Sequence, residues 1–144
     1  MLKRKLLTLI FATLLSISLL ASWFVLTEGE ELIAFFPMAL FVSWIAIPAI
    51  LLYGLPVSFL SEKLTKQFAN RQRICWSLVI HVIFGIGFIF FIGLLFETQT
   101  VLTDFNQFWR SYGIIFMASI LTSVCFWGVD ESLRYCSILK STNH

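Results

Sequence analysis

A single histidine is the residue best placed for chemistry, because it stands inside a long apolar stretch. His81 lies about two helical turns into residues 74–96. An ionisable side chain is costly to bury in a membrane, so such residues often carry protons or contact a substrate. Gly85 and Gly93 follow at helical spacing and form with His81 a stripe on which another helix can pack closely. Two interpretations stay open: a hydrogen-bonding residue that packs between helices, and a titrating group of a transporter.

Cysteines and acidic residues occur without the spacing that metal or redox chemistry requires. The three cysteines form no CxxC pair and show no zinc-ligand spacing: Cys75, Cys125 and Cys136. Three glutamates crowd into residues 27–31, but nothing there resembles a calcium-binding loop. We therefore expect no metal site and no cofactor.

No catalytic motif is present in the sequence. HExxH, GxSxG and the phosphate-binding loop are all missing. Asp130 and Glu131 form the only adjacent acidic pair apart from the glutamates of residues 30–31, and without a partner base we interpret them as a polar stop after an apolar stretch. We expect a protein that is not an enzyme.

The composition indicates where these residues are held. The chain has 144 residues, of which 59% are hydrophobic and 12% charged, whereas soluble domains carry about 25% charged residues. Four apolar stretches are long enough to cross a bilayer as helices, the fourth with its aromatic lead-in: residues 6–26, 33–52, 74–96 and 113–129. We predict an all-α fold, a transmembrane four-helix bundle of two antiparallel hairpins that forms one membrane domain over residues 1–144.

The basic residues predict the orientation. Nine lysines and arginines lie before the first stretch, between the second and third, or after the fourth, and Arg110 alone lies on the other side. Loops rich in lysine and arginine stay in the cytoplasm. The prediction is a multi-pass protein of the plasma membrane with both termini cytoplasmic.

A short amphipathic helix on the inner membrane surface is expected over residues 57–69, after a break or kink at Tyr53-Gly-Leu-Pro56. Its basic residues and those that follow are candidate contacts to anionic lipid headgroups: Lys63, Lys66, Arg71 and Arg73. The alternative is that these charges only set the orientation.

A second interfacial helix is expected over residues 104–112. Four aromatic residues fall on one of its faces: Phe105, Phe108, Trp109 and Tyr112. Such a face is typical of an aromatic belt at the membrane surface, and the alternative is a face that docks a partner.

Trp44 differs from the other tryptophans because it lies near the middle of the second apolar stretch. A buried indole N–H requires a hydrogen-bond partner. We expect Trp44 to face the bundle interior and bond to a neighbouring helix, with a ligand contact as the alternative.

The segment Tyr53-Gly-Leu-Pro-Val-Ser58, within residues 47–66 of a four-span chain, resembles a family of uncharacterised small membrane proteins from Bacillus-type bacteria. The resemblance implies a bacterial plasma membrane. It implies no known activity and assigns no site residues.

Two functions are consistent with these observations. The first is a non-enzymatic accessory protein that acts through another membrane protein or a second copy of itself within the lipid bilayer, with no nucleic acid involved. The second is a small oligomeric transporter or channel in which His81 is the polar group inside the membrane.

Overall fold

The computed structural model describes residues 2–29, 31–96 and 98–142, and within these ranges the chain is helical with no β-strand. The prediction of an all-α fold with four long apolar helices is confirmed. The elements in chain order are α1 (Leu2–Glu28), η1 (Leu32–Ala34), α2 (Phe35–Ala49), η2 (Ile50–Gly54), α3 (Leu55–Thr65), α4 (Asn70–Phe96), α5 (Thr98–Thr103) and α6 (Phe105–Thr142).

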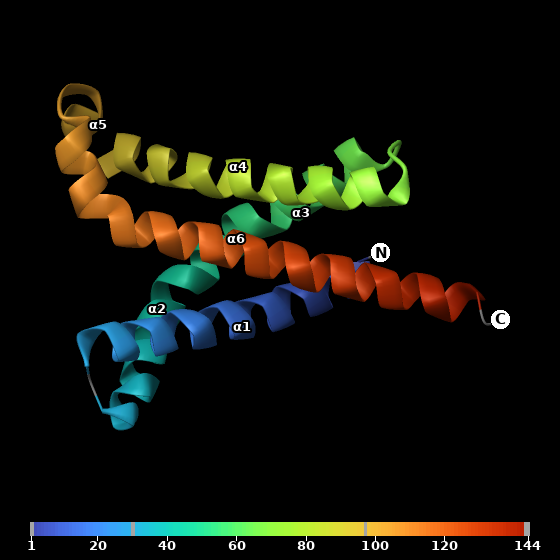
Figure 1. The fold of residues 1–144 in the computed structure, drawn as a ribbon, viewed down its shortest axis with the longest axis horizontal. Coiled ribbons are helices and arrows are strands. Elements are labelled where there is room, and N and C mark those ends of the chain that lie inside the picture. Colours follow the sequence, from blue (N-terminus) through green and yellow to red (C-terminus); the bar gives the residue numbers. More distant parts are fainter. Residues whose placement is uncertain (1, 30, 97, 143–144) are drawn as a thin grey trace.

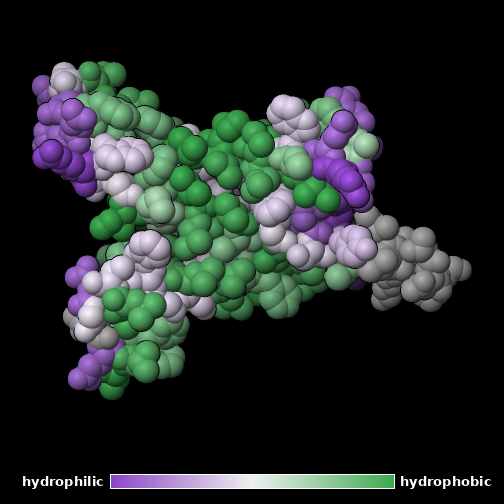
Figure 2. All heavy atoms as spheres, viewed as in Figure 1, coloured by the Kyte–Doolittle hydropathy of each residue, from purple (hydrophilic) through white to green (hydrophobic). Residues whose placement is uncertain are grey.

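Four helical stretches are long and apolar enough to cross a membrane: Lys3–Glu28, Leu32–Thr65, Asn70–Phe96 and Phe105–Ser137. Figure 2 shows hydrophobic side chains across the middle of the molecule and hydrophilic ones gathered at its two ends. In water this surface would be unstable, whereas hydrocarbon solvates it. These features support a multi-pass membrane protein.

The four long helices form two arms (Figure 1). In the first arm α1 packs along α2, and in the second arm α4 packs along α6. The arms meet where α1 crosses α6 and α3 lies on α4. Both termini lie at one end, which we call the terminal end, and the arms diverge toward the opposite end.

The second long helix bends without breaking. Of the break or kink expected at Tyr53-Gly-Leu-Pro56, the structure has no break, because α2 continues through the π-helical turn η2 directly into α3. Pro48 and Pro56 lack the N–H that would bond the carbonyl one turn earlier, and a π turn is a common local adjustment to such gaps. The helix expected over 57–69 is therefore α3, which ends at Thr65.

The interfacial helix expected over 104–112 is also not separate. It forms the first turns of α6, which runs unbroken from Phe105. Asp104 caps this start, because its side chain accepts a hydrogen bond from the N–H of Gln107 at 3.0 Å. The short helix α5 supplies the turn from α4, so the aromatic residues lie against α4 as part of a long helix.

Candidate functional site

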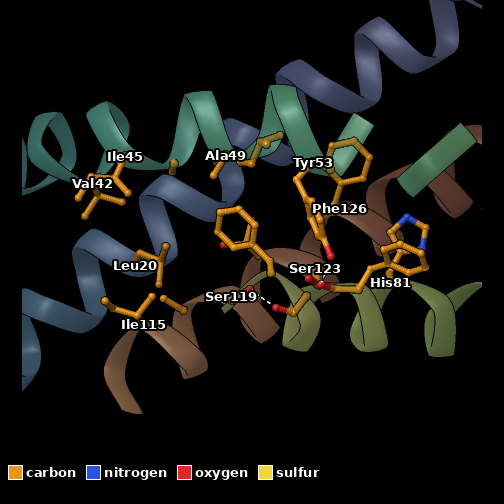
Figure 3. A pocket seen from close by; sticks show the side chains of 18 of the residues that line it. Leu20, Val42, Ile45, Ala49, Tyr53, His81, Ile115, Ser119, Ser123 and Phe126 are labelled. Carbon is orange, nitrogen blue, oxygen red and sulfur yellow. Dashed lines mark hydrogen bonds between the residues drawn. The ribbon is translucent and has the colours of Figure 1, made fainter. Parts of the chain in front are cut away.

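A cleft of about 360 Å³ lies between the two arms, and we call it the central cleft. Side chains from α1, α2, η2, α3, α4 and α6 line it, and it is partly open to the surroundings. Figure 3 shows a polarity gradient along it. Its apolar end carries Leu20, Val42, Ile45 and Ile115, and its polar end carries Tyr53, His81, Ser119 and Ser123.

His81 is almost completely buried, at 3% exposure, and lines the polar end of the cleft. Its Nδ1 lies 2.8 Å from the carbonyl oxygen of Ser77, one turn earlier in α4. Since a carbonyl only accepts, Nδ1 carries the hydrogen, and in the neutral ring Nε2 is then an acceptor. This Nε2 is buried and has no hydrogen-bond partner among the described residues. The ring stacks on Phe126 of α6, with centroids 6.2 Å apart.

Four residues with hydroxyl groups line the cleft together with the imidazole: Tyr53, Ser119, Thr122 and Ser123. Tyr53 donates to the carbonyl oxygen of Phe84 at 2.6 Å, and Ser119 donates to that of Gly85 at 2.8 Å. Both donors are therefore used, while their oxygen atoms can still accept. Ser123 also lines the cleft, and within the described part of the chain its hydroxyl has no hydrogen-bond partner.

The glycine stripe of α4 lies against α6 and against α5, which precedes it. A methyl group added to Gly85 would clash with the hydroxyl of Ser123. One added to Gly93 would lie 2.6 Å from a ring carbon of Phe108 and 3.0 Å from Val101. Both glycines are buried, so the backbone of α4 approaches its neighbours closely at these two positions.

A second polar feature lies toward the terminal end, and we call it the Lys5 cluster. It consists of four charged side chains from α1, α3 and α6: Arg4, Lys5, Glu62 and Asp130. The ammonium group of Lys5 is 1% exposed and lies 2.6 Å from Asp130, 3.1 Å from Glu62 and 2.6 Å from the hydroxyl of Ser58. Arg4 bonds to Glu62 at 2.5 Å. Four oxygen atoms therefore surround one buried cation once the Ser58 carbonyl at 3.4 Å is included.

Small hydroxyl residues extend this polar interior. Thr8 donates to Asp130 at 3.2 Å, and Ser61 bonds to Ser77 at 2.9 Å. Thr65 donates to the carbonyl of Ser61. The hydroxyl-bearing face of α3 thus points into the molecule, whereas Leu64 on the apolar stripe is exposed.

The interpretation of Asp130 and Glu131 as a polar stop is wrong for Asp130. Asp130 pairs with Lys5 of α1, while Glu131 pairs with Arg134 within α6 at 2.6 Å. Two signals in the sequence point to this pairing. Lys5 and Asp130 flank the first and fourth apolar stretches at the same predicted membrane depth, and Ser58, Ser61 and Thr65 share one helix face.

The expectation for Trp44 is also wrong. Its side chain is 85% exposed and projects from α2 away from the other helices. Among the other long helices α2 packs mainly against α1, so much of its surface faces outward. Trp44 is neither a core residue nor part of the central cleft.

The other candidate residues lie at the two ends of the molecule. Lys63, Lys66 and Arg71 are exposed near the terminal end, whereas Arg73 is partly buried with its guanidinium 4.0 Å from Glu62. These four do not converge on one site.

The aromatic face of α6 is only partly exposed. Phe105 and Trp109 are exposed, and Phe108 is 2% exposed beneath Tyr112, whose ring lies 4.8 Å away. Phe90 of α4 stacks near Phe105. Part of this face therefore packs within the second arm.

Among the described residues, no three histidine, cysteine, aspartate or glutamate side chains lie close enough to hold a metal ion. No protein family model matches the chain, and neither the curated proteins nor the solved structures contain a detectable relative.

Proposed function

We propose that this is a non-enzymatic protein of the plasma membrane that binds a hydrophobic small molecule in its central cleft. The volume of about 360 Å³ falls within the range of about 300–1,000 Å³ typical of ligand sites. Mostly apolar walls with a few convergent polar groups are also typical of such sites. The cleft is the observation that carries the proposal.

The dimensions of the cleft favour a small molecule over a helix of a partner protein. A helix with its side chains is about 10–12 Å across and needs a groove along much of the membrane. This cleft is instead lined at its polar end by His81 and Phe126, which stack on each other and are almost completely buried. An accessory role through a bound ligand is thus better supported than docking of a partner helix.

The Lys5 cluster favours binding over conduction. Beyond the polar end of the cleft, α1, α3 and α6 are joined by its ion pairs. A channel would need a continuous polar path. Here the buried ammonium group of Lys5 is instead surrounded by oxygen atoms of the protein. A role of His81 in transport would require these pairs to separate.

The ligand site can be tested with a photoactivatable alkyl diazirine in vesicles that contain the protein. We expect saturable labelling of cleft residues. Ala118→Phe places a ring in the cleft and should weaken labelling about tenfold, or roughly 1.4 kcal/mol. Met117→Phe is the matched control, because Met117 is 55% exposed on the outer face of the same helix. Labelling that never saturates, or that Ala118→Phe leaves unchanged, would refute the proposed site.

For the orientation, we propose that both termini are cytoplasmic. Nine of ten lysines and arginines support this arrangement, since they lie on the side of the termini in the predicted topology. A fluorescent protein that folds only in the cytoplasm should be active when fused after His144. An export-dependent phosphatase should be inactive there and active when inserted at Gly29. The reverse pattern would overturn the orientation and leave the ligand site untouched.

A further inference from the structure

We infer that the ligand of the central cleft is an uncharged amphiphile, a hydrocarbon body with a hydroxyl head that inserts toward Ser123. This inference rests on the proposed ligand site and adds the chemical class of its occupant. Three features of the cleft carry it: the polarity gradient, the absence of charged residues from its lining, and the unused hydroxyl of Ser123 at its polar end.

The polarity gradient sets the direction of insertion. Phenylalanine and branched aliphatic side chains surround the end where the arms diverge, and they match a hydrocarbon body. The polar groups lie at the enclosed end, where Tyr53 reaches from the first arm toward the α4 backbone (Figure 3). An amphiphile therefore enters with its head first, which is opposite to the position of a phospholipid with its head at the membrane surface.

The lining excludes a charged head. Among the residues that line the cleft, only His81 and the phenol of Tyr53 can ionise. An unpaired ion in a medium of low dielectric constant is strongly disfavoured. The nearby charges of Lys5 and Asp130 are already paired with each other at 2.6 Å, so they are not available to neutralise a ligand.

The hydrogen-bonding groups match a hydroxyl. Tyr53 and Ser119 have committed their hydrogen atoms to backbone carbonyls, which leaves their oxygens as acceptors. Ser123 can donate and accept, since its hydroxyl has no partner in the described part of the chain. A ligand hydroxyl both donates and accepts, and so it satisfies both kinds of group.

The experiment is a competition for the photolabelled cleft by molecules that share one hydrocarbon chain. Hexadecanol should compete about 2- to 10-fold better than hexadecane, as expected for one neutral hydrogen bond. Hexadecyl sulfate and hexadecyltrimethylammonium should compete no better than hexadecane. Dioleoylglycerol tests whether a hydroxyl amphiphile with two chains, such as a membrane lipid, also competes. An advantage over hexadecane for either alcohol supports the inference.

Ser123→Ala separates head recognition from binding of the chain. It should remove the advantage of hexadecanol while leaving competition by hexadecane unchanged. Ser132→Ala, on an exposed part of the same helix, should alter neither. Equal competition by all the molecules would overturn the inference and leave the ligand site standing. A charged competitor that outperforms hexadecanol would also overturn it. Absence of saturable labelling would instead refute the proposed function itself.

Discussion

Replacing Asp130 with alanine should lower the free energy of unfolding by about 3 kcal/mol or more, the largest effect we expect from a single substitution. The reason is that Lys5, at 1% exposure, would keep its charge inside the protein without its closest counter-ion. Glu62 remains 3.1 Å away but is shared with Arg4, which places the loss near the lower end of the range of about 3–5 kcal/mol for broken buried pairs. Reversible unfolding in mixed micelles, followed by helical circular dichroism, measures the change.

Two further variants test whether the lost pair is the cause. Joint replacement by Lys5→Met and Asp130→Leu removes both charges, so it should recover most of the stability. Glu28→Ala makes the same kind of substitution at an exposed residue of α1, and it should change stability by no more than about 0.5 kcal/mol. A loss below about 1 kcal/mol for Asp130→Ala would show that the Lys5 cluster does not join the helices as the structure indicates.

Hydropathy predicts the four long helices because each is apolar around most of its circumference and bounded by polar residues. The Lys5 cluster is harder to predict. Its ion pair joins residues 125 positions apart, and helix rotation and register decide whether they meet. Counting lysines and arginines uses their positions along the chain but ignores such pairing. For this reason the sequence indicates only that Lys5 contributes to the orientation in the membrane.

The face of α3 shows why one helical pattern can mislead. Val57, Leu60 and Leu64 recur at helical spacing and predict an amphipathic helix on the membrane surface. Inside a membrane, however, apolar side chains can face lipid while hydroxyls face protein. Accordingly Ser58 and Ser61 are buried and Leu64 is exposed, although Val57 of the apolar stripe is buried as well. The solvent on the outside decides which face points inward.

Trp44 and the central cleft could not be predicted for a related reason. Both depend on the divergence of the arms, which begins where Pro48 and η2 bend the second long helix. Proline can kink a helix, but neither the direction of the kink nor the space that it opens follows from the sequence. The outward bend leaves Trp44 exposed and creates the cleft between α2 and the second arm.

The second large effect on stability is expected at Gly93. Gly93→Ala should lower the free energy of unfolding by about 1–3 kcal/mol, as is typical of overpacking. The added methyl would lie 2.6 Å and 2.9 Å from two ring carbons of Phe108, which is itself 2% exposed and cannot swing aside freely. Phe108→Leu in the same chain removes the contacted ring edge, so the double variant should be more stable than additivity of the single changes predicts.

The matched control is Gly128→Ala, which should have the opposite sign. A methyl group at Gly128 meets nothing within 4 Å, and the residue lies within α6. Alanine is favoured over glycine inside a helix by roughly 0.5–1 kcal/mol, so this variant should be more stable than the parent protein. If Gly93→Ala also stabilises the protein, then the reduced backbone freedom of the unfolded chain outweighs any clash in the folded one. In that case α4 does not require the close approach to Phe108 that the structure places there.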